Sequence, residues 1–397
     1  MMKYAQTFGL STRTDKIKDT SKEVWFSMRA LLLVTVILIS FGLTMLYSVS
    51  YGVAGLKYFT VQLLAVSAGI AGGILIILLG YREIASKALI WCGIILLMLL
   101  ITAFCFRSIN GAARWIRIGS FSVQPSEFAK LAIAIFIAKY CADNIRTFSL
   151  LKHRRGLIPL LGVLALMLGG IAIGKDLGTT LLATIVAFVT LLAAGLYLRY
   201  LSIPAILLPI AGVAIYFLNE NRRIRMTSFL DPEKLANKEG YQLTNSLYAL
   251  GSGNWFGTGF MTSKFTGGAL PEFHTDFILA VVGEELGLVA MLTIIFLYVL
   301  YGYFSLKIAL CSESRLGTLL GFALTCSVIL QAGINLLAVS GSAPTKGMPA
   351  PFISYGGSNL ISCLLATALI ISIGFEQLEP GYAEKITSKL PWNRKKR

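Results

Sequence analysis

Apolar residues in this chain come in continuous blocks of about twenty, and this pattern constrains the fold more than any other feature. A block of that length matches an α-helix that crosses the hydrocarbon core of a bilayer. The chain of 397 residues is 56% hydrophobic and only 14% charged, whereas about a quarter of a soluble domain is charged. The blocks do not alternate as the strands of a membrane β-barrel do. The sequence therefore predicts an all-α, polytopic integral membrane protein.

We predict about ten transmembrane helices, with boundaries good to a few residues. They lie at about residues 30–50, 58–79, 86–106, 127–142, 157–174, 177–197, 200–218, 277–304, 317–340 and 358–376. An even number of spans places both chain ends on one side. Lys and Arg are more frequent on that side than in the opposite loops, which indicates that both termini are cytoplasmic.

This topology divides the chain into three parts. Residues 1–29 are an N-terminal tail, 30–376 the ten-helix membrane domain, and 377–397 a basic C-terminal tail. The loops predicted to face outward are 107–126, 219–276 and 341–357, and they are richer in Gly, Pro, Trp and charge than the short inner loops. We therefore expect chemistry or recognition at the outer membrane–water boundary.

The formal charge of +16 does not indicate a nucleic-acid partner. The basic residues gather at the chain ends and in short loops, a distribution typical of topology signals and of attraction to anionic membrane lipid. The chain has six cysteines without CxxC spacing and only two histidines, so no His/Cys metal cage can be drawn. No G-x-x-x-x-G-K-[ST] motif is present, which excludes nucleotide-driven transport.

The first outer loop combines basic and aromatic residues and leads into a helix. Arg114, Trp115 and Arg117 form an amphipathic patch suited to the membrane interface. Glu127 and Lys130 are three residues apart, so they share a helix face and can pair. Interfacial anchoring with a local ion pair and a functional role remain equally open from spacing alone.

Asp176 lies in a tight connection, Gly174-Lys-Asp-Leu-Gly-Thr-Thr180, between two predicted spans. One interpretation is a solvated turn. The other is that Asp176 leans into a polar cavity beside Lys130. The sequence does not decide between them.

The largest polar interval ends at His274-Thr-Asp276, where a long apolar run begins. Asp276 is predicted at a helix N-terminus, either as a simple N-cap or as a general base in an outward cleft. His274 is more often a hydrogen-bonding neighbour than a ligand in such a place. Glu284 and Glu285 lie about two turns deeper, where acidic residues normally face a structural partner or a cavity.

The last outer loop, residues 340–359, is rich in Gly, Pro and Ser and places Lys346 where it can meet an anionic head group. Non-helical backbone at membrane depth is tolerated only when it is buried in protein or lines a wet cavity. Gln331 and Asn335, four residues apart on the preceding span, are interpreted as polar contacts between helices. Together these elements suit a cavity for an amphiphile with an anionic head.

Several of these segments resemble the SEDS family (shape, elongation, division and sporulation) of bacterial membrane proteins. The matching segments cover nearly the whole chain and include R-W-I-R-I-G-S-F-S-V-Q-P-S-E-F-A-K, D-L-G-T-T, G-Y-Q-L-T-N-S-L, L-P-E-F-H-T-D-F-I-L-A-V-V-G-E-E-L-G and P-T-K-G-M-P-A-P-F-I-S-Y-G-G-S. The segments 344–347 and 251–257 look more like the family's division and sporulation branch than its elongation branch.

The resemblance implies a peptidoglycan polymerase that links lipid II on the outer face of the bacterial cytoplasmic membrane, at the septum in a division protein. The family's essential Asp falls on Asp276, which would activate the acceptor 4-hydroxyl for inverting attack. The cavity would be shaped by Trp115, Glu127, Lys130 and Asp176. Candidates to meet the pyrophosphate charge are Arg114, Arg117, Arg223, Arg225 and Lys346.

The resemblance also implies partners and limits on cofactors. The expected partners are lipid II, a class B penicillin-binding protein that cross-links the strands, and other division-site proteins. A divalent cation, Mg or Mn, is expected to assist, without an organic cofactor. Two departures from the family pattern are Gly174-Lys175 before D-L-G-T and the segment from Met261 to Ala269. Two alternatives stay open, a lipid II flippase and a non-catalytic scaffold for the penicillin-binding protein.

Overall fold

The computed structural model describes residues 13–106, 114–118, 121–144, 154–196, 229, 240–265, 272–344 and 347–388. Within these ranges most residues lie in helices, as predicted. Two short strands, β1 (Ile116–Ile118) and β2 (Phe121–Val123), form an antiparallel hairpin in the first outer loop.

The predicted spans that fall within the described ranges all coincide with helices. These helices are α2 (Arg13–Ala54), α3 (Lys57–Leu79), α5 (Ala88–Cys105), α6 (Pro125–Asp143), α8 (Arg154–Ile173), α9 (Leu177–Ala193), α13 (Ile278–Leu310), α14 (Arg315–Val339) and α15 (Gly357–Leu378). Six helices in the described part are long and apolar enough to cross a membrane, and α8 and α9 contain shorter apolar helices. The span predicted at 200–218 lies outside the described residues.

Some helical segments were not predicted as such. They are α4 (Tyr81–Ser86), α12 (Tyr241–Ser252), α16 (Tyr382–Ser388) and the part of α2 before residue 30. Val24 and Met28 show why α2 starts early: they are four residues apart, share a helix face, and are buried. A Cβ added to Gly374 would lie 2.6 Å from the Met28 sulfur, so this face packs closely on α15.

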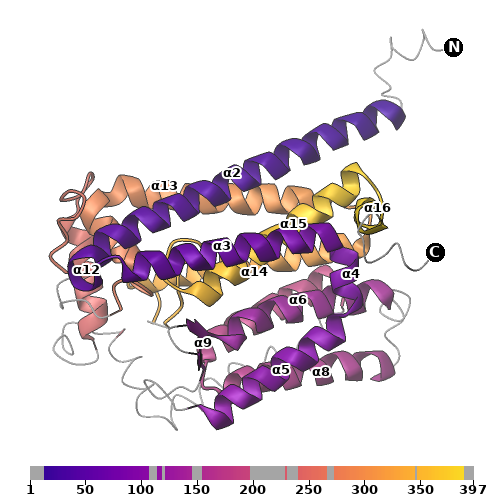
Figure 1. Cartoon of the computed structure of the whole chain (residues 1–397), viewed down its shortest axis with the longest axis horizontal. Coiled ribbons are helices and arrows are strands. Elements are labelled where there is room, and N and C mark those ends of the chain that lie inside the picture. Colours follow the sequence, from indigo (N-terminus) through magenta and orange to yellow (C-terminus); the bar gives the residue numbers. More distant parts are fainter. Residues whose placement is uncertain are drawn as a thin grey trace.

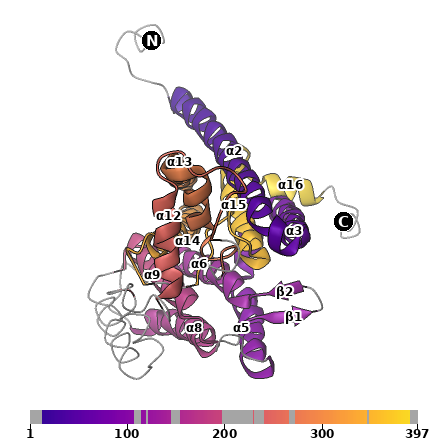
Figure 2. The same cartoon turned by 90° about the vertical axis from the view of Figure 1, so that its left-hand side faces the viewer.

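Helix α6 lies in the middle of the bundle. It contacts α5, α8, α9, α14 and α15, while α3 packs most extensively on α15 and α13 on both α2 and α14 (Figures 1 and 2). Nearly every α6 residue from Pro125 to Ala138 is buried, including Glu127 and Lys130. The central helix of the bundle therefore carries two of the predicted site residues.

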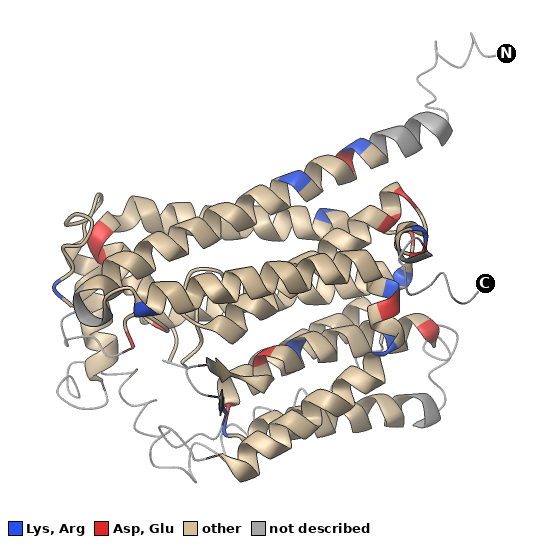
Figure 3. Ribbon diagram, viewed as in Figure 1, with Lys and Arg blue, Asp and Glu red and all other residues tan. Residues whose placement is uncertain are grey.

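The bundle has two distinct ends. The first turns of α2 lie with α4 and α16 at one end, here called the α16 end, and α12 lies at the opposite end, the α12 end (Figure 1). Charged residues lie mainly toward the ends of the bundle and are sparse along the helices (Figure 3). This arrangement matches a topology in which both tails share one side and the elaborate loops share the other.

Helix α13 is broken at Gly287, which has a φ of 75° and a ψ of −171°. In a continuous helix Leu288 N–H would donate to the Glu284 carbonyl and Val289 N–H to the Glu285 carbonyl. The break leaves these two donors and two acceptors without their helical partners. The segment before the break, Ile278–Leu286, is a half-helix, and its residues up to Glu285 are all buried.

The glycine-rich loop after α12 supplies the missing partners. Leu288 N–H donates to Asn254 O at 2.9 Å and Val289 N–H to Trp255 O at 3.2 Å. In return the N–H groups of Thr258 and Gly259 donate to the Glu284 and Glu285 carbonyls at 2.9 and 3.0 Å. The loop thereby replaces both lost hydrogen bonds, as backbone at membrane depth requires.

Glycine is required where this loop touches α13. Gly257 has a φ of +80°, and a Cβ there would meet the Glu285 carbonyl oxygen. Gly257→Ala is therefore expected to lower the free energy of unfolding by more than about 1–2 kcal/mol, measured by denaturant titration in detergent.

Gly333→Ala on α14 is the matched control for that substitution. A Cβ at this helical glycine meets no atom within 4 Å, so stability should stay the same or rise slightly. Equal stability of the two variants would contradict the close docking of the loop on α13.

Candidate functional site

Asp276 lies directly before the half-helix of α13, at the α12 end of the bundle. The N-cap position belongs to Phe277, so Asp276 precedes the position from which a side chain would cap the helix. Asp276 is half-buried and borders a pocket with a free volume of about 10 Å³, roughly the space that one water molecule needs. The described residues lining this pocket are Asp276, Phe277, Ile334, Asn335, Ala338, Gly347 and Met348.

The loop that precedes α15 lies against the Asp276 carboxylate. Gly347 has a φ of +52°, and a Cβ on it would lie 3.1 Å from Asp276 Oδ2. From α14, the Asn335 side-chain amide donates to the backbone carbonyl of Asp276 at 2.8 Å and to that of Met348 at 2.6 Å. Asn335 therefore links the segment before α13 to the loop before α15, beside the Asp276 carboxylate.

His274 packs among aromatic rings. Its ring stacks on Tyr58 of α3 with centroids 4.6 Å apart and lies 5.6 Å from the ring of Tyr355. Among the described residues His274 Nδ1 is buried without a hydrogen-bond partner. Burial lowers the pKa of His274, and the nearby carboxylate of Glu272 opposes that shift.

Glu284 and Glu285 have the structural role that the sequence left open. Glu284 accepts hydrogen bonds from the Ser263 hydroxyl at 2.5 Å and from Lys264 N–H at 2.8 Å. Glu285 accepts from the Ser48 hydroxyl at 2.6 Å. Both carboxylates hold the loop after α12 and the end of α2 against the half-helix.

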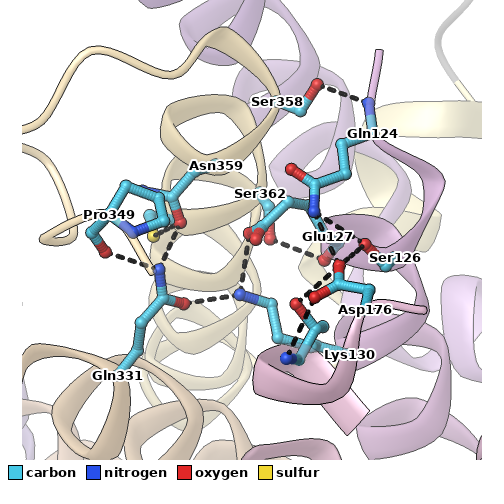
Figure 4. Close-up of polar contacts among 12 residues, drawn as sticks. Gln124, Ser126, Glu127, Lys130, Asp176, Gln331, Pro349, Ser358, Asn359 and Ser362 are labelled. Carbon is cyan, nitrogen blue, oxygen red and sulfur yellow. Dashed lines mark hydrogen bonds and ion pairs between the residues drawn. The ribbon is translucent and has the colours of Figure 1, made fainter. Parts of the chain in front are cut away.

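A second polar cluster lies on α6 and includes the predicted pair of Glu127 and Lys130 (Figure 4). Lys130 Nζ donates to Glu127 Oε2 at 2.7 Å and to Gln331 Oε1 on α14 at 2.5 Å. Both charged side chains are only 4% exposed. The local ion pair is confirmed, and it is buried in the bundle rather than solvated.

Gln331 joins this cluster to the loop beside Asp276 (Figure 4). Its Nε2 donates to Pro349 O at 2.9 Å and to Asn359 Oδ1 at 2.7 Å. Gln331 and Asn335 therefore bind the carbonyls of two successive loop residues from successive turns of α14. The prediction of polar contacts between helices is confirmed for Gln331, which binds Lys130 of α6 and Asn359 of α15, whereas Asn335 binds backbone carbonyls outside the helices.

Asp176 is buried as the N-cap of α9 and does not lie in a solvated turn. Its carboxylate accepts from Thr179 N–H and Oγ1 at 3.3 and 3.0 Å, from Ser126 Oγ at 2.7 Å and from Gln124 Nε2 at 2.8 Å (Figure 4). Arg114 forms an ion pair with Asp176, with 3.7 Å between Arg114 Nη1 and Asp176 Oδ1. The sequence did not identify Ser126 and Gln124 as members of this site.

Some of the remaining predicted residues lie near β1, and the others lie outside the described residues. Arg114 and Trp115 are half-buried just before β1, and Arg117 on β1 is exposed. Arg223, Arg225 and Lys346 lie outside the described residues, as does most of the loop 219–276. In the part of the chain that the structure describes, no group of three His, Cys, Asp or Glu side chains could hold a metal ion.

Comparison with known proteins decides the family. A family model described as the cell cycle proteins FtsW, RodA and SpoVE matches residues 28–378. The chain belongs to this family. It is therefore a multi-pass membrane protein, and the resemblance to SEDS proteins seen in its motifs is confirmed.

Relatives in several bacteria are described as probable peptidoglycan glycosyltransferases FtsW. The chain is 36% identical over 367 residues to a probable peptidoglycan glycosyltransferase FtsW of Bacillus subtilis, covering 87% of this chain and 89% of the relative. It is 34% identical over 354 residues to a protein of that description in Trichlorobacter lovleyi, covering 86% of this chain and 92% of the relative.

Solved structures share the fold. A chain from a study of structural coordination of polymerization and crosslinking by a peptidoglycan synthase complex matches with a TM-score of 0.74 at 24% identity, covering 88% of this chain and 98% of that one. The rod shape determining protein RodA of Thermus thermophilus matches with a TM-score of 0.64 at 22% identity, covering 88% of this chain and 97% of that one. These likenesses support the bundle as a SEDS fold.

The buried pair on α6 makes a testable prediction. Lys130→Met leaves Glu127 buried without its cation and is expected to lower the free energy of unfolding by about 3–5 kcal/mol. Adding Glu127→Gln in the same chain removes the stranded charge and should restore part of that loss. Denaturant titration in detergent measures both, and a Lys130→Met variant as stable as the wild type would contradict the buried pair.

The aromatic site of His274 predicts a pH dependence. Because burial lowers its pKa from 6.5, the unfolded chain takes up the proton at a higher pH than the folded chain. This residue therefore costs no stability well above pH 6.5, and stability falls as the pH drops below that value.

His274→Phe keeps a ring against Tyr58 and is expected to reduce that acid-dependent loss. The measurement is the difference in unfolding free energy between about pH 7.5 and pH 5.5 for the wild type and the variant. An identical pH dependence in the two proteins would show that His274 is protonated as easily when folded as when unfolded.

Proposed function

We propose that this chain is a peptidoglycan glycosyltransferase of the FtsW type, which polymerises lipid II into β-1,4-linked glycan strands. The observation that carries the proposal is the position of Asp276, at the start of a buried half-helix and beside a small pocket at the α12 end. The relatives described as probable peptidoglycan glycosyltransferases cover most of this chain at 34 and 36% identity, which supports the same activity here.

In the proposed reaction Asp276 is the general base. The 4-hydroxyl of the acceptor sugar attacks the anomeric carbon of the donor with inversion, and its proton passes to the Asp276 carboxylate. A new glycosidic C–O bond forms as the bond from the anomeric carbon to the pyrophosphate oxygen breaks. Undecaprenyl pyrophosphate leaves with the electron pair of that bond.

The negative charge on the leaving pyrophosphate requires cationic partners. Arg114 is the described candidate nearest the polar clusters, since it pairs with Asp176, and Arg117 is exposed on the neighbouring strand. Lys346, Arg223 and Arg225 stay candidates from the sequence. Trp115 is proposed to contact the sugar or lipid, with Glu127, Lys130 and Asp176 shaping the cavity from α6 and α9.

A divalent cation, Mg or Mn, is proposed to accompany the pyrophosphate. The described residues do not form a protein cage for it, and Mg²⁺ often binds through substrate phosphates with one or two carboxylates. No step of the proposed reaction passes through the metal.

We further propose that the α12 end faces outward and that the protein works at the division septum with a class B penicillin-binding protein and other division-site proteins. The solved chain of similar fold comes from a peptidoglycan synthase complex that coordinates polymerization with crosslinking, which supports a cross-linking partner. The positions of the basic residues in the sequence support the orientation.

Two other functions would use the same fold. A lipid II flippase needs alternating access and would move the lipid without forming a glycan. A scaffold for the penicillin-binding protein needs neither. The half-buried Asp276 carboxylate beside a pocket favours the polymerase over both.

The test uses the purified protein, together with its partner, and lipid II in detergent. Wild type is expected to make glycan strands, and Asp276→Ala and Asp276→Asn are expected to lose at least about 100-fold in rate, since general-base catalysis contributes that much. The matched control is Asp143→Asn, which removes a carboxylate at the α16 end and should leave the rate unchanged.

The outcomes separate the three functions. Full activity of Asp276→Asn would overturn the general-base role. Transport of lipid II in proteoliposomes without glycan formation would favour the flippase, and neither activity, with the partner still bound, would favour the scaffold.

A further inference from the structure

Asn335 of α14 lies at the point where two segments meet beside the Asp276 carboxylate. It is 2% exposed, and one side-chain nitrogen makes two hydrogen bonds, at 2.8 Å to Asp276 O and at 2.6 Å to Met348 O. Both partners are carbonyl oxygens, which only accept, so the orientation of the amide is set by chemistry. One NH₂ group therefore joins the start of α13 to the loop before α15.

The two joined segments border the pocket on either side. Asp276 and Gly347 both line it, and a Cβ on Gly347 would lie only 3.1 Å from Asp276 Oδ2. A side chain at position 347 would therefore crowd the carboxylate, and the hydrogen bond to Met348 O limits the movement of the loop away from it. The distance between loop and carboxylate depends on the Asn335 amide.

Other side chains fasten the same loop farther from the carboxylate. The hydroxyl of Tyr298 on α13 donates to Pro351 O at 2.6 Å, and Gln62 of α3 donates to Ser354 O at 3.0 Å. Asn335, by contrast, binds both the loop and the backbone of residue 276. This difference separates holding the loop from positioning the carboxylate.

The oxygen of the Asn335 amide has no hydrogen-bond partner in the described part of the chain. Asn335 Oδ1 is buried without a hydrogen-bond donor, although Asn335 lines the pocket. A buried acceptor without a donor is costly, and an asparagine that only joined helices would be expected to have both ends of its amide paired.

We propose that Asn335 is a positioning residue for Asp276, whose single NH₂ group sets the place of that carboxylate by binding the backbone of residues 276 and 348 together. The inference rests on the proposed function, in which Asp276 is the general base. Asn335 acts through Asp276 and takes no proton itself.

The test compares three substitutions in the full-length protein with its partner, using lipid II polymerisation. Asn335→Leu keeps the approximate shape and removes both donated hydrogen bonds, and Asn335→Asp keeps the shape while replacing the NH₂ donors by oxygen. Both are expected to lower kcat about 10- to 100-fold, the effect of misplacing a catalytic group by about 1 Å, with KM for lipid II changed less than about twofold.

Tyr298→Phe is the matched control, because it removes one buried hydrogen bond to the same loop without touching residue 276. Its kcat should stay within about twofold of wild type. In an Asp276→Asn background, Asn335→Leu should lower the residual rate no further, because a positioning residue has no effect once its catalytic group is gone.

The possible results are distinguishable. An unchanged kcat in Asn335→Leu or Asn335→Asp, a rise in KM alone, or an equal loss in Tyr298→Phe would overturn the inference while the Asp276 result stood. Loss of folding in Asn335→Leu would leave the decision to the isosteric Asn335→Asp variant. Full activity of Asp276→Asn would instead overturn the proposed function, and the inference with it.

Discussion

The repair of the helix break at Gly287 is the interaction on which the rest of the site depends. A broken helix exposes two donors and two acceptors, and hydrocarbon offers them no partner. The loop after α12 replaces both lost hydrogen bonds, with donors from Thr258 and Gly259 and acceptors from Asn254 and Trp255. Glycines allow this backbone-to-backbone approach. A short buried half-helix can therefore end at Gly287 with its backbone groups paired, and Asp276 lies just before its N-cap.

The opposite wall of the site is held by side chains rather than by backbone. Asn335 and Gln331 bind successive carbonyls of the loop before α15, and Gln331 also accepts from Lys130 on α6. Polar contacts therefore run from the buried pair of Glu127 and Lys130 to the segment beside Asp276 (Figure 4). Hydrogen bonds between buried polar groups make a rigid support, which suits a carboxylate that must meet a sugar hydroxyl in one orientation.

Much of this architecture follows from local sequence. Apolar length predicts the helices, a spacing of three predicts the pair of Glu127 and Lys130, and the polar-to-apolar junction places Asp276 at a helix start. The partners across the bundle do not follow, because Gln331 lies 201 residues from Lys130 and its contact depends on tertiary packing. The early start of α2 was missed for a similar reason, since polar residues hid the buried face of Val24 and Met28.

Asp276 is proposed to face the acceptor sugar from the α12 end, and a structure with lipid II bound at that end would test this position. In that structure the acceptor 4-hydroxyl is expected within about 2.6–3.2 Å of an Asp276 carboxylate oxygen, the reach of a general base. A bound acceptor whose 4-hydroxyl lies against another side chain, with the Asp276 carboxylate turned away from the sugar, would contradict it.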